Sequence, residues 1–128
     1  MKINDITSII IEETFYIHRK LGPGCFESVY EEILAYRLAK RGLSIERQRG
    51  APVVFEEVRM NVGFRADIIV EGKELIEIKS LELLPRVAEM QVLTYLRLTQ
   101  IQIGLLINFN VEKLTDGVKR IANNYVEE

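Results

Sequence analysis

The sequence predicts an α/β fold in which a mixed four-stranded sheet is flanked by helices. Apolar residues recur at helical spacing in several segments, which indicates amphipathic helices. Three extended segments rich in β-branched residues lie together, and a helix separates them from a fourth, as in a crossover connection. In order, the segments are helices over residues 3–20 and 26–41, strands within residues 44–57, 63–70 and 74–80, a helix over 86–98, a strand over 101–109 and a helix over 111–125.

The two N-terminal helices have recognisable boundaries. Asn4 or Asp5 is the expected N-cap of the first helix, Gly22-Pro23-Gly24 ends it, and Gly42 is the expected C-cap of the second. The spacing predicts buried side chains at Ile6, Ile9, Ile10, Ile17 and Leu21 in the first helix, and at Phe26, Val29, Ile33, Leu34 and Leu38 in the second.

The strands and the third helix follow the same reasoning. Gly50-Ala51-Pro52 predicts a bend or bulge in the first extended segment, and residues 58–61 are expected to turn. Glu71-Gly72-Lys73 predicts a tight turn between the next two strands. Residues 101–109 form an unbroken apolar run, the pattern of a strand covered on both faces. The third helix is expected to bury Val87, Met90, Leu93 and Leu96 or Leu98.

Length and composition fit a single domain spanning residues 1–128. The chain is 48% hydrophobic and 28% charged, which is ordinary for a soluble globular protein. No apolar run approaches the roughly 18 residues of a membrane span, and the N-terminus lacks a secretory signal, so a cytoplasmic location is expected. One cysteine, Cys25, and one histidine, His18, exclude an intramolecular disulfide and a His/Cys metal centre.

The net charge of the chain does not exclude nucleic acid as a partner. A formal net charge of −2 counts against a strongly basic nucleic-acid-binding surface. A nucleic-acid enzyme is still compatible, because a carboxylate site concentrates negative charge that divalent ions neutralise. A local basic cluster indicates either a binding patch or a solvated helix end and edge strand. Its members are Arg37, Lys40, Arg41, Arg47 and Arg49.

Three charged residues interrupt the central hairpin. Asp67 lies in the first apolar strand, while Glu77 and Lys79 alternate with Ile76 and Ile78 in the second. Because side chains alternate across a strand, Glu77 and Lys79 share one face, and pairing through the turn brings Asp67 close to Glu77. Such a cluster is costly to bury unless a cation or a substrate uses it.

A second acidic group stands at the start of the second helix. Glu27, Tyr30 and Glu31 have the spacing i, i+3, i+4 and therefore share one helical face. This face follows a glycine turn, close to backbone N–H groups that favour anions. Acidic residues are also common stabilisers of a first helical turn, so Glu27 has a purely structural explanation too.

These residues together resemble the PD-(D/E)XK nuclease superfamily. Asp67 on one strand, Glu77-Ile78-Lys79 on the next and Glu27 on an upstream helix match the motif of that superfamily. Its restriction-endonuclease-like core, α-β-β-β-α-β, matches the segment order from residue 26 onward, with the first helix as an N-terminal addition. Residues 24–30, GCFESVY, are similar to the G-x-x-E-x-x-Y pattern of one branch, the GxxExxY proteins. Ala66 departs from the proline that often precedes the first acid.

The resemblance implies a metal-dependent phosphodiesterase. Asp67, Glu77 and the carbonyl group of Ile78 would bind Mg²⁺ or Mn²⁺, and Glu27 would be a further acid that binds directly or through water. The metal would activate a water molecule. Lys79 would hold the nucleophile and counter the charge of the scissile phosphate. Gln91 and Tyr95, one turn apart on the third helix, would position water or substrate. Tyr30 and Glu31 would support the site.

Each of these residues also has a structural explanation. Asp67 could pair with Lys79 or Arg65, and Glu77 and Lys79 could be ordinary solvated strand charges on an exposed face. Tyr30 could belong to the edge of the core, and Gln91 and Tyr95 could serve helix packing.

Three functions follow from these alternatives. The leading interpretation is a small Mg²⁺-dependent endonuclease acting on DNA, with a homodimer or a partner supplying the surface that grips the substrate. A non-catalytic nucleic-acid- or protein-binding module on the same fold is the second interpretation. An enzyme acting on RNA or on a nucleotide is the third, since no residue in the sequence reads the sugar.

Overall fold

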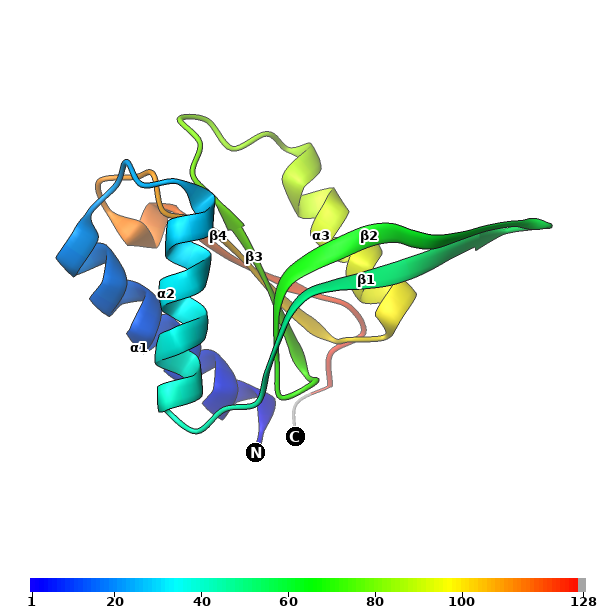
Figure 1. The fold of residues 1–128 in the computed structure, drawn as a ribbon, viewed down its shortest axis with the longest axis horizontal. Helices are drawn as coiled ribbons and strands as arrows, with labels where there is room; N and C mark the ends of the chain where they lie inside the picture. The colour runs from blue at the N-terminus through cyan, green and yellow to red at the C-terminus, as the bar shows by residue number, and fades with distance from the viewer. Residues whose placement is uncertain (127–128) are drawn as a thin grey trace.

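The computed structural model describes residues 1–126 and places helices on both faces of a mixed sheet (Figure 1). The strands lie in the order β1-β2-β3-β4-β5, and every pair is antiparallel except β3 and β4. The α/β class is thereby confirmed. The elements are α1 (Ile3–Leu21), α2 (Glu27–Lys40), β1 (Ile45–Phe55), β2 (Val58–Val70), β3 (Glu74–Lys79), α3 (Val87–Thr99), β4 (Ile103–Asn108), the 3-10 turn η1 (Leu114–Asp116) and β5 (Val118–Ala122).

Two hydrophobic clusters cover the two faces of the sheet. Ile76 and Ile78 of β3 belong to the cluster that includes Ile10 of α1 and Leu34 of α2. Leu75 belongs to the second cluster, which is built around α3. The alternation of side chains along β3 therefore directs Ile76 and Ile78 toward α1 and α2, and Leu75, Glu77 and Lys79 toward the side of α3.

The connection from β3 through α3 to β4 is the expected crossover. β3 and β4 pair in parallel register, with Glu77 opposite Leu106 and Lys79 opposite Asn108. Every residue of β4 is buried, as expected for an apolar strand that has a layer of helix on each face.

The helix expected over residues 111–125 is wrong. This segment contains only the turn η1 and then β5, which pairs with β4 as a fifth strand. Asp116-Gly117 is a turn signal that the helical pattern overlooked. Gly117 also approaches β4 so closely that an added Cβ would lie 2.2 Å from the carbonyl oxygen of Asn108. By pairing with β4, β5 satisfies backbone groups of a strand that an open edge would leave unpaired.

Some local predictions are also wrong. Lys2, rather than Asn4 or Asp5, is the N-cap of α1. The turn expected over residues 58–61 lies at Glu56 and Glu57, so β2 already begins at Val58. Several side chains expected to be buried are exposed instead, because the helices meet the sheet along narrower stripes than the apolar pattern suggested: Leu21, Phe26, Val29, Val87 and Met90. Of the alternatives Leu96 and Leu98, Leu96 is the buried one.

The bend expected at Gly50-Ala51-Pro52 is confirmed, since the pairing of β1 with β2 shifts register between Ala51 and Val53. Beyond this shift, residues 53–60 form the end of a hairpin that projects past α3, and we call this segment the arm (Figure 1). Within residues 1–126, none of the helices combines the length and the apolar character that crossing a bilayer requires.

Glu74 is a buried carboxyl group at the start of β3. Both of its carboxyl oxygens lie within hydrogen-bonding distance of Thr7 Oγ1, at 2.7 and 2.9 Å, and the Thr7 hydroxyl can also donate to the carbonyl of Ile3. Burial raises the pKa of Glu74 from 4.5 to about 7, although the Thr7 hydrogen bond and the charge of Arg120 oppose the shift.

We expect this raised pKa to make stability depend on pH. Between about pH 4.5 and 7 the folded protein keeps a proton that the unfolded chain has released, so the free energy of unfolding falls as pH rises. Glu74→Gln should remove that loss and stabilise the protein at pH 8 by up to about 3 kcal/mol. Urea unfolding at pH 5 and pH 8 measures the free energy of unfolding of this variant and of wild type. The control is Glu112→Gln, at an exposed position. Equal effects of the two substitutions would contradict the prediction.

Candidate active site

The carboxyl groups of Asp67 and Glu77 meet where the pairing of β2 with β3 ends. The last pair of this ladder is Ile68 with Ile76, so Asp67 and Glu77 occupy the next opposing positions on the same face of the sheet. Oδ2 of Asp67 accepts a hydrogen bond of 2.7 Å from the backbone N–H of Ile78. This bond fixes the Asp67 carboxyl group against β3, and the register of the two strands places Asp67 close to Glu77, as the sequence predicted.

The surroundings of Glu77 strongly disfavour its charged form. Burial raises its pKa from 4.5 to about 9, and the contact with the Asp67 carboxyl group and its charge act in the same direction. The charge of Lys79 opposes the shift, while the negative charge of Glu27 adds to it. Two carboxyl groups this close share a proton or require a cation between them.

Lys79 ends β3 on the same face as Glu77, and its side chain is half-buried. Its backbone is held by the N–H of Phe109, which donates to the Lys79 carbonyl over 3.0 Å. Within residues 1–126, the structural alternatives for Asp67, ion pairs with Lys79 or Arg65, are both wrong. Arg65 instead donates to the carbonyl of Gln48 over 3.0 Å. Lys79 therefore acts on the carboxyl pair by its charge and is not locked into a contact with Asp67.

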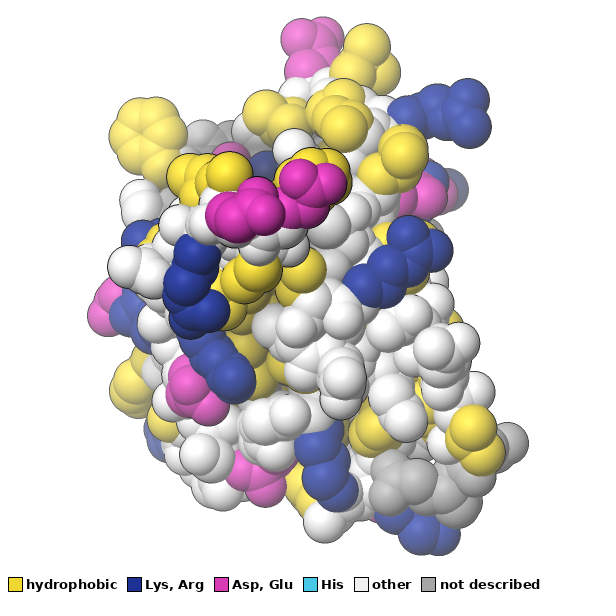
Figure 2. Space-filling view, turned by 90° about the vertical axis from the view of Figure 1, so that its right-hand side faces the viewer, with side chains coloured by type: hydrophobic (Ala, Val, Ile, Leu, Met, Phe, Trp, Pro, Cys, Tyr) yellow, Lys and Arg dark blue, Asp and Glu magenta, His cyan; other side chains and the backbone are white. Residues whose placement is uncertain are grey.

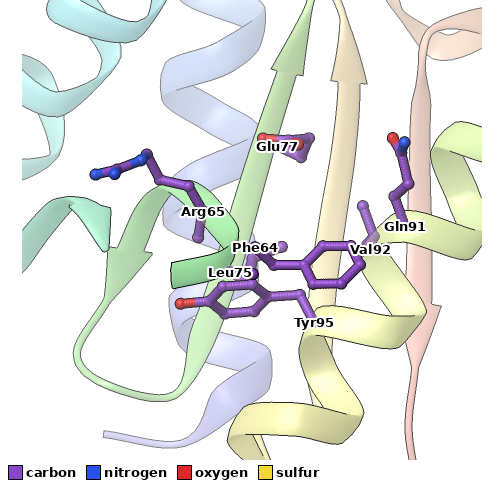
Figure 3. Close-up of a pocket in the computed structure, with 9 residues that line it drawn as sticks. Phe64, Arg65, Leu75, Glu77, Gln91, Val92 and Tyr95 are labelled. Atoms are coloured by element: carbon purple, nitrogen blue, oxygen red, sulfur yellow. The ribbon is translucent and has the colours of Figure 1, made fainter. Parts of the chain in front are cut away.

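A cavity of about 310 Å³ opens beside this carboxyl pair. Glu77 borders it from β3, Gln91 and Tyr95 border it from α3, and Phe64 and Arg65 border it from β2. Figure 3 shows the rings of Phe64 and Tyr95 together below the Glu77 carboxyl group, with the Gln91 amide on the side of α3. The structure thus brings Gln91 and Tyr95 to Glu77, as the sequence predicted.

A family model describing the PD-(D/E)XK nuclease superfamily matches residues 4–121. The chain belongs to the PD-(D/E)XK nuclease superfamily. The match is to the superfamily as a whole, so membership of the GxxExxY branch stays a prediction. A search of the curated proteins found no match.

A solved structure shares the fold of this superfamily member. The crystal structure of the protein SSO0001 aligns with a TM-score of 0.58 and 21% sequence identity, covering 77% of this chain and 50% of that one. The chain therefore spans half the length of that protein. At this level of identity the likeness shows the fold alone.

Gln48 is a residue of the site that sequence reasoning missed. Its Nε2 donates to Oε1 of Glu31 over 2.8 Å and to Oδ1 of Asp67 over 3.2 Å. Its backbone is left-handed, with φ 54°, which is unusual for a residue inside a strand. Arg47 in turn holds Glu31 through its Nε and Nη2, at 3.1 and 2.9 Å. No sequence signal predicts this link, because it depends on the unusual backbone at Gln48.

Glu31 thus reaches the site through Gln48, and Tyr30 has a different role. Tyr30 is fully buried, and its ring stacks on Phe109 with centroids 4.1 Å apart. Its hydroxyl donates to the carbonyl of Gly22 over 2.6 Å and accepts the N–H of Cys25 over 3.1 Å. Tyr30 therefore anchors the loop between α1 and α2 from within the core, in agreement with the core alternative, and its support of the site stays a prediction.

The same loop presents Glu27 near the end of β3. Ser80 Oγ donates to the carbonyl of Cys25 over 2.7 Å, which ties the loop to the residue after Lys79. Glu27 is exposed and borders a separate hollow that Ser80 also lines. After burial and the Asp67 carboxyl group, the negative charge of Glu27 makes the smallest contribution to the raised pKa of Glu77. Tyr30 thus holds the loop that immediately precedes Glu27.

The donor set of this PD-(D/E)XK site fits a hard divalent cation. Asp67 and Glu77 offer carboxylate oxygens in contact with each other, and the carbonyl of Ile78 lies between Glu77 and Lys79 in the chain. Among residues 1–126, no three His, Cys, Asp or Glu side chains are grouped so as to hold a metal ion. A cation here would therefore take its other ligands from backbone, water or substrate oxygen, as Mg²⁺ commonly does.

Proposed function

We propose that this protein is a Mg²⁺- or Mn²⁺-dependent nuclease that hydrolyses phosphodiester bonds in DNA. Membership of a nuclease superfamily supports hydrolysis of nucleic acid. The observation that carries the proposal is the contact of the Asp67 and Glu77 carboxyl groups beside Lys79, at the border of a cavity. A cytoplasmic location and a single domain, both expected from the sequence, are part of the proposal.

Asp67, Glu77 and the carbonyl of Ile78 would hold the cation, with Glu27 adding negative charge from outside. The cation would supply activation of water and neutralisation of charge on the phosphate. The Lys79 ammonium group, on the same face as Glu77, would hold the attacking water and stabilise the charge that develops on the phosphate. Gln91, exposed at the cavity border, would orient water or the sugar-phosphate backbone.

The second candidate, a non-catalytic binding module on this fold, has less support. A binding module has no use for a half-buried carboxyl group whose pKa is raised to about 9. Such perturbed groups are typical of functional sites. The basic cluster expected as a binding patch also has structural partners, which leaves less free charge for phosphate: Arg37 and Arg41 pair with Glu13, Arg47 with Glu31 and Glu32, and Arg49 with Glu46.

A cleavage panel tests the proposed function. Purified protein is incubated with Mn²⁺ or Mg²⁺ and single-stranded, duplex, flap and four-way-junction DNA, with matched RNA substrates in parallel. We expect cleavage of DNA that EDTA abolishes and that Asp67→Ala loses together with Mn²⁺ binding measured by calorimetry. Mn²⁺ binding without cleavage of any substrate would favour the binding module, and cleavage of RNA alone would reassign the substrate.

Gln48 offers a finer test of the same site. Gln48→Leu keeps a side chain of similar size but removes the donor that orients Asp67 Oδ1. We expect Mn²⁺ affinity to fall about 10- to 100-fold, the usual effect of losing a hydrogen-bond partner of a metal ligand. Gln102→Leu, on a half-buried glutamine away from the cavity, is the matched control. Unchanged affinity in Gln48→Leu would mean that Asp67 needs no such orientation.

A further inference from the structure

The cavity beside the carboxyl pair has an apolar floor and a polar border. The buried side chains in its lining are aliphatic or aromatic: Ala66, Leu75, Val92 and Tyr95. The charged and amide side chains in its lining are exposed or half-buried: Arg65, Glu77 and Gln91. Sites for small organic ligands commonly have this arrangement, in which an apolar lining supplies contact area and a few polar groups fix the orientation.

Two aromatic rings form part of the floor. Figure 3 shows the rings of Phe64 and Tyr95 together below the Glu77 carboxyl group. The Tyr95 hydroxyl donates to the carbonyl of Arg49 over 3.0 Å, which holds the Tyr95 ring in place. The Phe64 side chain is only half-buried and lines the cavity, so its ring offers a surface on which a planar group can stack.

The volume and the surroundings of the cavity indicate the chemistry of its occupant. Its volume of about 310 Å³ is at the lower end of the range of roughly 300–1,000 Å³ for small-ligand sites, so one ring system fits better than a longer segment. An apolar floor disfavours an anionic phosphate, whereas a nucleobase is uncharged and has apolar faces. Because Glu77 borders the cavity, an occupant would belong to the part of a nucleic acid that lies beside the carboxyl pair.

We propose that this cavity receives an unpaired nucleobase next to the cleaved phosphate. Neighbouring base pairs cover both faces of a base inside a duplex, so only a base that has left the stack can enter. The Phe64 ring would stack on its face, and Arg65 and Gln91 would stand where the sugar-phosphate backbone enters. The preferred substrate is therefore DNA with an unpaired nucleotide at the cleavage site. This inference rests on the proposed nuclease function.

Tryptophan fluorescence tests the contact directly. The chain contains no tryptophan, so Phe64→Trp introduces a single reporter in the wall of the cavity. The measurement uses a Lys79→Ala background with Mg²⁺, so that DNA binds without being cleaved. A duplex with one unpaired adenine should quench this fluorescence by stacking, and the fully paired duplex of the same sequence should quench it much less.

Phe55→Trp in the same background is the matched control. Phe55 is 71% exposed and lies about 13 Å further along β1 than Ala51, the partner of Phe64. The arm that carries it projects past α3 in Figure 1, and Figure 2, which looks at the projecting end, shows hydrophobic side chains there beside acidic ones. The adenine should leave the fluorescence of Phe55→Trp unchanged. Equal quenching of both reporters, or equal quenching of Phe64→Trp by both duplexes, overturns the proposal.

Binding affinities test the role of the ring without a reporter. The quantity measured is the affinity for the duplex with the unpaired adenine divided by the affinity for the paired duplex. Phe64→Leu, which keeps an apolar side chain but removes the ring, should lower this ratio about 5-fold or more, and Phe55→Leu should not change it. Replacing the adenine by an abasic unit should lower the ratio of the wild type in the same way. A ratio that survives both changes contradicts stacking in the cavity.

The two proposals fail in different ways. Cleavage of DNA by the wild type, with no quenching of Phe64→Trp by DNA that is bound, would retain the nuclease function and overturn the base-binding cavity. Selective quenching of Phe64→Trp by the unpaired adenine, with no cleavage by the wild type, would retain the cavity and overturn the nuclease function. Circular dichroism of Phe64→Trp and Phe64→Leu verifies that each variant keeps its fold.

Discussion

Lys79→Ala should lower the cleavage rate by about 10²- to 10⁴-fold, the range observed when a group that stabilises transition-state charge or positions a reacting proton is removed. The ammonium group ends β3 on the face of Glu77, and its charge opposes the rise in the pKa of that carboxyl group. Cleavage of the preferred DNA substrate under single-turnover conditions measures the effect.

The same variant should keep its affinity for Mn²⁺ or bind it more tightly, because a positive charge is removed from beside the carboxyl pair. Loss of cleavage with retained metal binding thus separates the role of Lys79 from that of Asp67. Lys113→Ala, an exposed lysine after β4, is the matched control. Activity that survives Lys79→Ala would point to a contaminating nuclease and remove the case for catalysis by this chain.

Glu77→Gln should stabilise the metal-free protein while abolishing cleavage. With a pKa near 9 in the folded state, Glu77 keeps a proton that the unfolded chain loses near pH 4.5, so stability falls as pH rises through this interval. The amide carries no charge and has no such penalty. Allowing for partial exposure and for the coupling with Asp67, we expect a gain of about 1–3 kcal/mol at pH 8.

Denaturant unfolding in EDTA at pH 5 and pH 8 measures this gain. The difference between Glu77→Gln and wild type should grow from pH 5 to pH 8, whereas the exposed Glu82→Gln should show no such growth. A destabilised Glu77→Gln at pH 8 would mean that the carboxylate is satisfied in the fold without a cation. The expected result instead makes Glu77 a residue kept for function at the expense of stability.

The part of the fold that follows from periodicity was predictable from the sequence. Helices α1, α2 and α3 and the buried strand β4 have strong patterns, and the turn at Gly72 has the left-handed backbone, φ 64°, that favours glycine. β5 was not predictable in this way. Its short pattern fits a helix as well as a strand, and its pairing with β4 is a tertiary interaction that a local pattern does not contain.

The residues of the site also differ in whether local patterns or tertiary contacts determine their positions. Asp67 and Glu77 could be placed together because one tight turn fixes the register of β2 against β3. The spacing of Gln91 and Tyr95 placed them on one face of α3, and that face borders the cavity. Gln48 could not be found, since its contacts link α2, β1 and β2 across long sequence separations.

The hydrogen bonds around Asp67 also decide the direction from which an ion can arrive. Oδ2 is occupied on one side by the Ile78 N–H and Oδ1 on one side by the Gln48 amide. Each carboxylate oxygen has two acceptor directions, so one remains open on each. An incoming cation therefore has to share the Asp67 carboxyl group with these two donors, and any substitution that rotates this group would misplace the ion even where every ligand is still present.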